Sequence, residues 1–226
     1  MPIVVLEPDV VIPSGIETLA DFRRWATADD FPERGRVDYI AGQIEVDMSP
    51  NRITSHGLAY AAIITELSRL VNQGNLGQVL PDNTLIVSDV ADLACEPDLS
   101  FISWDSLRSG RVRYVTAPKA GHESDYLEVY GGPDLVVEIV SPSSVAKDTK
   151  RLPPAYFAAG VREFWLVDAR EAKPKLIIHK RGGTRFEPVE PGADGFHASG
   201  VLAKRFRLTR RPGPVPNTVV YRLESR

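Results

Sequence analysis

The stretch GGPDLVVEIVSPSS, residues 131–144, decides how the centre of this chain folds. Its run LVVEIV, residues 135–140, is apolar on both alternating faces except at Glu138. Such a strand is typical of a buried position in a parallel or mixed sheet. An ionised carboxylate there would cost several kcal/mol unless a cation or hydrogen bonds compensated it. The sequence therefore predicts a buried strand in which Glu138 has a partner.

A helix and a second strand follow this run. The helix covers at least Pro154 to Ala159, and the strand REFWLVD contains the apolar run 164–167. A strand-helix-strand succession across 135–168 predicts a βαβ-like core.

Hairpins flank this core on both sides. RVDYIAGQIEVDMSP reads as two short strands joined at Ala41-Gly42, and KPKLIIHKRGGTRFEPVEP reads as a hairpin that turns at Gly182-Gly183. With these hairpins, the predicted fold class is α+β, with a mixed central sheet flanked by helices.

Two helices are expected before the core, within residues 14–30 and over roughly 52–72. In the second helix, His56 shares the inward face with Ile63 and Leu67. Residues 105–133 are polar and rich in Gly, Lys and Arg, which favours a long loop with one strand at most.

The bulk composition is that of an ordinary globular protein, because 43% of the 226 residues are hydrophobic and 25% are charged. No apolar run approaches the roughly 18 to 20 residues of a membrane helix. The start, MPIVVLEPDVVIP, has no basic segment before its apolar residues, so no signal peptide is predicted. A cytoplasmic protein is the default expectation. The single cysteine, Cys95, excludes an internal disulfide and predicts a small buried residue.

Charge is distributed unevenly along the chain, although the formal net charge is only −3. From Lys173 to the C-terminus there are 12 Lys and Arg against 4 Asp and Glu, and the first 172 residues hold 15 against 26. Such asymmetry fits a basic arm that contacts nucleic acid beside an acidic body that binds metal. It equally fits a solvated basic β-surface.

Three features could meet at one end of the core sheet: Glu96-Pro97-Asp98, Glu138, and the stretch SPSSVAKDTKR with Asp148 and Lys150. Two carboxylates on adjacent strands can hold Mg²⁺, which prefers oxygen ligands and keeps several waters. The backbone carbonyl of Ile139 could add a further ligand. A nearby lysine would orient water or stabilise developing negative charge.

Several ordered blocks resemble the Uma-two family of bacterial restriction-endonuclease-like proteins, a branch of the PD-(D/E)XK nuclease superfamily. The blocks are VDYIAGQIEVDMSP, EPDLSFI, PDLVVEIVSPSS, Asp148, Tyr156 and GVREFWLVD, and they span about 37–168. The resemblance implies a single restriction-endonuclease-like domain over 1–226, with a basic β-rich extension at 173–226. It also implies that Asp98 and Glu138 bind Mg²⁺, or Mn²⁺ in its place.

The resemblance further places two kinds of residue near the site: an acidic residue of the first hairpin (Asp38, Glu45 or Asp47) and His56. The superfamily lysine two residues after the glutamate would fall at Val140, and the lysine usual in this branch would fall at Leu152. Neither can supply it. Lys150 is the nearest substitute, but Pro153-Pro154 disfavours helical geometry at Leu152, so Lys150 is expected in a loop.

Each candidate residue also has a purely structural interpretation. Glu138 could pair with a buried Lys or Arg, Asp98 could belong to a turn, and His56 could be a core histidine. Asp38 and Glu45 could be surface charges of a strand. The arginines of RSGRVR could clamp phosphates or stay solvated; they are Arg108, Arg111 and Arg113.

The leading hypothesis is a Mg²⁺-dependent endonuclease that acts on DNA. Asp98 and Glu138 hold the metal, and Lys150 or Arg151 stabilises charge. The arginines of 108–113 and of the basic C-terminal segment hold the phosphodiester chain. The alternatives are a degenerate nuclease fold that binds DNA without cutting it and a protein-interaction module. A homodimer is expected only by analogy with the fold class.

Overall fold

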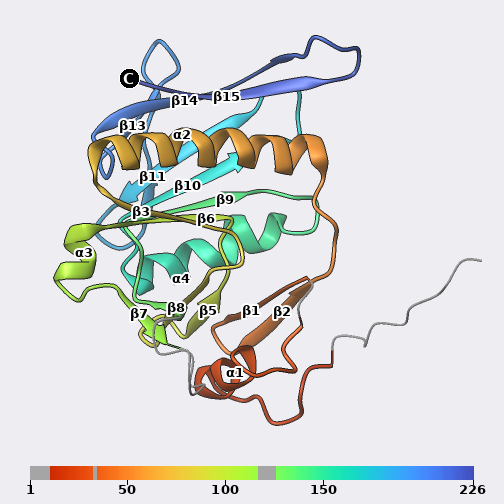
Figure 1. The fold of residues 1–226 in the computed structure, drawn as a ribbon, viewed down its shortest axis with the longest axis vertical. Coiled ribbons are helices and arrows are strands. Elements are labelled where there is room, and N and C mark those ends of the chain that lie inside the picture. The colour runs from red at the N-terminus through yellow and green to blue at the C-terminus, as the bar shows by residue number, and fades with distance from the viewer. Residues whose placement is uncertain (1–10, 33–34, 117–125) are drawn as a thin grey trace, which may run out of the picture.

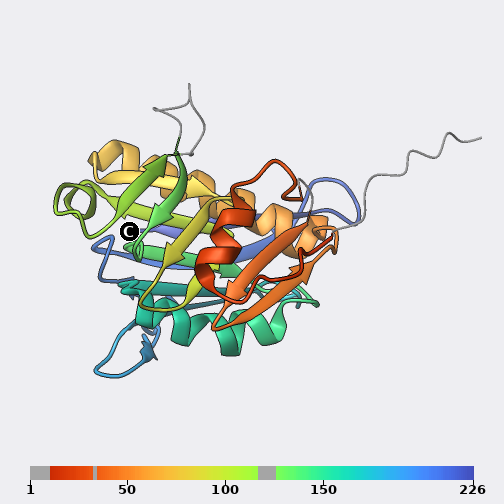
Figure 2. The same ribbon diagram turned by 90° about the horizontal axis from the view of Figure 1, so that it is seen from below.

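The computed structural model describes residues 11–32, 35–116 and 126–226. Figures 1 and 2 show a layered α+β arrangement in which a central mixed sheet lies between two other layers. The fold class expected from the sequence is confirmed.

The central sheet has the strand order β12-β11-β10-β9-β6-β3. Strands β9 and β10 are parallel, and the other neighbours in this sheet are antiparallel. The strands are β3 (Gly77–Pro81), β6 (Leu99–Ser103), β9 (Leu135–Ile139), β10 (Glu163–Asp168), β11 (Lys175–Arg181) and β12 (Phe186–Pro188).

One face of the central sheet is covered by helix α2 (Leu58–Gly74) and a three-stranded sheet. The strands of this three-stranded sheet are β13 (His197–Ser199), β14 (Lys204–Pro212) and β15 (Val219–Ser225). Leu135, Val137 and Ile139 of β9 point into this layer and pack in one core cluster with α2.

The opposite face packs against helix α4 (Leu152–Ala159) and the other six-stranded sheet, whose order is β2-β1-β5-β4-β8-β7. Val136 lies in the cluster with Tyr156 of α4 and Cys95 of β5. The strands are β1 (Arg36–Ile40), β2 (Gln43–Asp47), β4 (Leu85–Ser88), β5 (Leu93–Cys95), β7 (Arg113–Thr116) and β8 (Tyr126–Tyr130). Strand β9 is therefore buried on both faces, as its composition indicates.

The remaining helices are short. Helix α1 (Leu19–Ala26) begins with a capping box between Thr18 and Asp21 and packs its apolar face on β1, β4 and β5. Helix α3 (Trp104–Arg108) follows β6. Single π-helical turns, η1 (Ile53–Gly57) and η2 (Lys147–Arg151), lead directly into α2 and α4.

Both predicted hairpins are present. Strands β1 and β2 join through Ala41 and Gly42, which both have positive φ, as a tight type I′ turn requires. Strands β11 and β12 pair across the Gly182-Gly183 turn.

Two predictions about secondary structure were wrong. The long loop expected at 105–133 contains most of α3 and the strands β7 and β8, while residues 117–125 lie outside the described residues. Leu152, expected to break from helical geometry, is helical. The prolines at 153–154 occupy the first turn of α4, where a backbone N–H has no helical partner in any case. The N–H of Leu152 itself bonds to the Lys147 carbonyl across η2.

Candidate active site

Glu138 lies at the centre of the candidate site, on β9, with only 1% of its surface exposed. Its Oε1 accepts a hydrogen bond of 2.5 Å from the Tyr156 hydroxyl. Its Oε2 is buried and has no hydrogen-bond partner among the described residues. Burial raises the pKa of Glu138 well above its usual value, and the charges of Asp148 and Asp98 raise it further.

Asp98 precedes β6 and lies beside the end of β9. Its Oδ2 accepts the backbone N–H of Ile139 at 2.6 Å, and its Oδ1 lies 2.9 Å from the Arg36 guanidinium and 3.1 Å from His56 Nε2. Burial alone would raise the pKa of Asp98, but His56 and Arg36 hold it below its usual value. The structure thus brings Asp98, Glu138 and His56 together, as the sequence predicts.

Asp148 is a second buried carboxylate next to Glu138. It lies in η2, where its Oδ2 accepts a 2.5 Å hydrogen bond from the Ser144 hydroxyl, while its Oδ1 has no partner among the described residues. Burial raises its pKa to about 6, against a lowering by Ser144 and Lys147. Asp148 belongs to the stretch SPSSVAKDTKR that was expected near the site, but no role was predicted for it.

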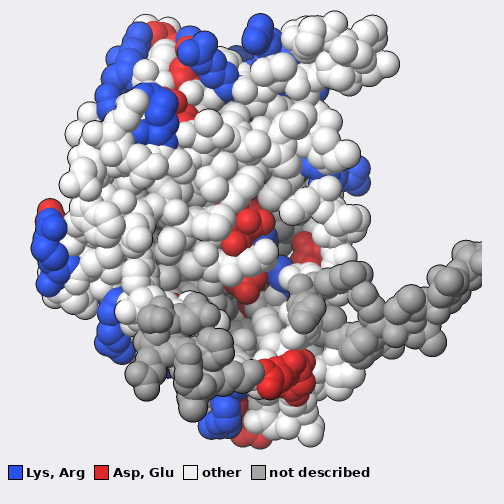
Figure 3. All heavy atoms as spheres, in the orientation of Figure 1, with Lys and Arg blue, Asp and Glu red and all other residues white. Residues whose placement is uncertain are grey.

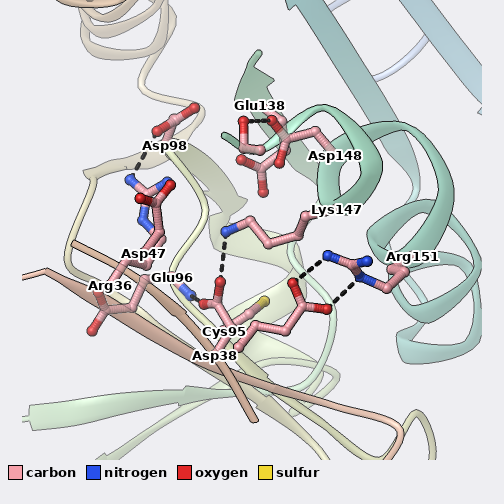
Figure 4. A network of polar contacts seen from close by, with 12 residues as sticks. Arg36, Asp38, Asp47, Cys95, Glu96, Asp98, Glu138, Lys147, Asp148 and Arg151 are labelled. Atoms are coloured by element: carbon pink, nitrogen blue, oxygen red, sulfur yellow. Dashed lines mark hydrogen bonds and ion pairs between the residues drawn. The ribbon is translucent and has the colours of Figure 1, made fainter. Parts of the chain in front are cut away.

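The lysine of the site is Lys147. Its Nζ donates to Asp38 Oδ2 at 2.6 Å, and only 5% of the residue is exposed. Burial alone would lower its pKa, but the charges of Asp38 and Glu138 raise it above the usual value. Figure 4 shows its side chain reaching between the Glu138–Asp148 pair and Asp38.

Lys150 does not take the place proposed for it, because its side chain is exposed in η2. A helical turn directs residues four apart to one face, so Lys147 and Arg151 face the first hairpin while Lys150 turns to solvent. Lys147, which was not predicted, is instead the buried lysine beside Asp38 and Glu138. Arg36 was also missed, because nothing in its local sequence ties it to Asp98, 62 residues away.

The first hairpin forms one wall of the site. Asp38 on β1 is buried rather than a surface charge, and its Oδ1 accepts the Glu96 N–H at 3.0 Å. On β2, Glu45 is paired with Arg151 through a 2.5 Å hydrogen bond. Asp47 accepts a 2.8 Å hydrogen bond from the Ser143 hydroxyl.

These contacts surround a cavity of about 760 Å³ that both the hairpin and the 143–151 segment line. Burial raises the pKa of Glu96, whose N–H bonds to Asp38 of this cavity, to about 7, with a further contribution from the charge of Asp38. Figure 3 shows acidic side chains gathered in the central hollow of this face.

The profile of the Uma2 family, described as "Putative restriction endonuclease", matches residues 19–211. The chain belongs to the Uma2 family. A crystal structure of a putative nuclease of the DUF820 group from Anabaena variabilis ATCC 29413 is similar, with a TM-score of 0.58 and 19% sequence identity. The match covers 82% of this chain and 90% of that one, and it shows a shared fold. No curated protein matches the chain.

A divalent cation is the partner that the Uma2 resemblance implies for Glu138. Glu138 Oε2 and Asp148 Oδ1 are buried carboxylate oxygens that have no hydrogen-bond partner in the part of the chain that the structure describes, and carboxylate oxygens are the ligands that Mg²⁺ prefers. All three contacts of Asp98 use its two oxygens, so Asp98 is the less available carboxylate. The donor set fits Mg²⁺, which is commonly bound through one or two carboxylates and keeps its other ligands as water.

The site is nevertheless not a complete protein cage. Within residues 11–32, 35–116 and 126–226, no three His, Cys, Asp or Glu side chains are grouped so that they could hold a metal ion.

None of the helices in this part of the Uma2 chain is long and apolar enough to span a membrane.

The three arginines proposed as phosphate contacts lie away from this constellation. Arg111 donates to Asp134, Ser106 and the Gly132 carbonyl, which leaves it a structural role between loops. Arg108 pairs with Asp105 on the surface of α3, and Arg113 covers the Tyr130 ring at 4.0 Å. None of the three lines the cavity at the site.

Proposed function

We propose that this protein is a Mg²⁺-dependent endonuclease that hydrolyses DNA phosphodiester bonds, with Mn²⁺ as an alternative cofactor. The observation that carries the proposal is the pair of unpartnered carboxylate oxygens, Glu138 Oε2 and Asp148 Oδ1, buried beside Lys147. Membership of a family described as restriction endonucleases supports the reaction class.

Glu138 and Asp148 would hold the cation, with Asp98 as the neighbouring carboxylate. A bound Mg²⁺ supplies Lewis-acid activation of water and neutralises charge on a phosphate. Tyr156 fixes the orientation of the Glu138 carboxylate through its hydrogen bond. The Ile139 N–H and Arg36 do the same for Asp98.

Lys147 is the residue suited to stabilise the developing negative charge of the reaction. Its ammonium group has three N–H donors, and the hydrogen bond to Asp38 uses one of them. The raised pKa of Lys147 keeps the group charged at neutral pH. His56 positions Asp98 and does not line the cavity beside Lys147.

Nicking of supercoiled plasmid DNA in the presence of Mg²⁺ or Mn²⁺ tests this proposal. The wild-type protein should convert plasmid to open circles, and Glu138→Ala should reduce the rate by about 100-fold or more. Glu187→Ala removes an exposed carboxylate on β12 and is the matched control, expected to cut like the wild type. Equal rates for wild type and Glu138→Ala would refute the enzymatic role.

A second candidate function is DNA binding without cleavage. The incomplete metal cage and the fully engaged Asp98 favour it. It predicts salt-dependent binding of duplex DNA that survives Glu138→Ala, together with intact plasmid after incubation with Mg²⁺, Mn²⁺ or Ca²⁺.

A further inference from the structure

A second cavity, of about 530 Å³, lies next to the acidic site. Three arginines and two hydroxyl side chains line it, and no Asp or Glu does. Its walls come from the start of η1, from the turn after β9, from the chain after β10 and from β14. The residues that matter are Arg52, Thr54, Ser55, Pro142, Arg170 and Arg210.

The charge of this cavity is not neutralised by carboxylates at each arginine. Arg52 is exposed, and its guanidinium group has no hydrogen-bond or ion-pair partner among the described residues. Arg210 donates to the Glu171 carbonyl at 3.0 Å and lies beside the Tyr221 ring. Only Arg170 has an acidic partner, a two-bond contact with Asp168.

The other arginine cluster of the molecule is different in this respect. Arg205 and Arg226 both pair with Asp194, and Arg207 pairs with Glu224 at 2.7 Å. Of the 12 basic residues after position 172, Arg205, Arg207 and Arg226 are held in these ion pairs, whereas Arg210 has a backbone carbonyl as its partner. An unbalanced positive cavity is what an anionic ligand requires.

The cavity and the acidic site share structural elements. Ser55 immediately precedes His56, whose ring contacts Asp98. Pro142 lines this cavity, and the next residue, Ser143, lines the cavity beside Lys147. Figure 3 shows a basic patch at the edge of the face whose central hollow is acidic, beside the chain that enters α2.

We propose that the cavity of Arg52, Arg170 and Arg210 binds a backbone phosphate of the DNA strand next to the bond that is cut. This inference rests on the proposed function, and it gives that function a strand-positioning subsite. Planar guanidinium groups bind phosphate oxygens in pairs, and the Thr54 and Ser55 hydroxyls can donate to the same oxygens. Phosphate contacts of this kind set the register of a nuclease on its substrate without reading sequence.

Fluorescence anisotropy with a fluorescein-labelled 24-base-pair duplex, in EDTA, tests the subsite without any cleavage. Arg52→Ala/Arg210→Ala should weaken binding by about 10-fold or more at low salt and reduce the slope of log K against log salt by about 1, because one phosphate contact is lost. Arg24→Ala/Arg185→Ala removes the same charge from surface positions that line neither cavity, and it should bind like the wild type.

Arg52→Glu is a second variant, chosen because the exposed side chain can change without disturbing the fold. Arg52→Glu should weaken duplex binding at least as much as the single change Arg52→Ala. If the duplex is held through a phosphate, free inorganic phosphate should displace it from the wild type more effectively than from the double variant.

The inference is overturned if the wild type binds no duplex, if the double variant binds as the wild type does, or if the control pair weakens binding equally. A protein that shows the predicted loss of binding but leaves plasmid intact with every metal would refute the nuclease proposal alone. The two failures are therefore distinguishable.

Discussion

Glu163 and Glu138 lie on the neighbouring parallel strands β10 and β9, and both are almost completely buried. Glu163 is fully satisfied: its oxygens accept hydrogen bonds from Trp165 Nε1, the Ser199 hydroxyl and the backbone N–H groups of residues 200–201. Glu138 accepts one hydrogen bond, from the Tyr156 hydroxyl, and its Oε2 accepts none from the described residues. The same residue type in the same sheet is thus a structural clamp in one place and an unsatisfied acid in the other.

This difference in hydrogen bonding distinguishes structural carboxylates from those still able to bind a ligand. Asp134, a third buried acid, accepts from Ser103, Ser106, Arg111 and Arg162, so it too is engaged on both oxygens. Buried acids are normally satisfied, because an empty carboxylate oxygen forfeits its hydration. Among the described residues, Glu138 and Asp148 each have a buried carboxylate oxygen without a hydrogen-bond partner, and the proposed metal site rests on this pair.

The largest expected effect separates the two lysines of η2. Lys147→Met leaves Asp38 buried without its cation and should lower the free energy of unfolding by about 3 to 5 kcal/mol. Lys150→Met, at an exposed position, should change it by less than about 0.5 kcal/mol. Urea denaturation measures both. Equal effects would mean that Lys147 is not held by Asp38.

A smaller effect should distinguish the two glutamates directly. Glu163→Gln places an amide NH₂ against N–H donors and should lower the free energy of unfolding by about 2 to 3 kcal/mol. Glu138→Gln keeps an acceptor for Tyr156 and cannot ionise beside Asp148, so stability should be unchanged or higher. Thermal unfolding at pH 7.5 checks this. A loss at Glu138 as large as that at Glu163 would remove the contrast between them.

The smallest effect is in the pH dependence of stability. The pKa of Asp148 is raised from 3.8 to about 6 in the folded protein, so the folded state binds more protons than the unfolded state from about pH 4 to about pH 7. Stability should therefore fall as pH rises, by about 1 kcal/mol from this group between pH 5 and pH 7. Asp148→Asn should remove this slope in urea titrations without metal. A slope that persists unchanged in the variant would assign it to another group.

Mg²⁺ should act in the opposite direction on the same pair. A cation binds the ionised carboxylates, so the increase in melting temperature caused by Mg²⁺ should be larger at pH 7.5 than at pH 5. Asp148→Asn should show little increase at either pH. An equal increase in the variant and the wild type would place the cation elsewhere.

Much of the fold could be predicted from local patterns. The β9–α4–β10 unit, both flanking hairpins and the buried face of α2 each follow from apolar periodicity and turn residues within about 30 positions. The segment at 105–133 was misread because β7 and β8 are short, partly polar strands, and their stability comes from the sheet partners they find in the folded protein.

The candidate site was predictable only in part. Asp98, Glu138 and His56 come from motif positions and meet as expected. The identity of the lysine depends on the π-helical phase of η2, which turns Lys147 inward and Lys150 outward. Asp38 was among the hairpin acids that the family resemblance placed near the site, whereas Arg36 was missed. Both reach the site because β1 packs beside β5, a contact between distant parts of the chain that no local pattern encodes.

The thiol of Cys95 donates to the Tyr156 hydroxyl, which in turn donates to Glu138, so this sole sulfhydryl lies one residue behind the candidate site. Burial raises its pKa well above the usual value and shields it from alkylating reagents while the protein stays closed. Its labelling rate therefore reports how often the wall behind Glu138 opens. Cys95 is therefore a built-in probe of local opening at the site, and no further cysteine has to be introduced.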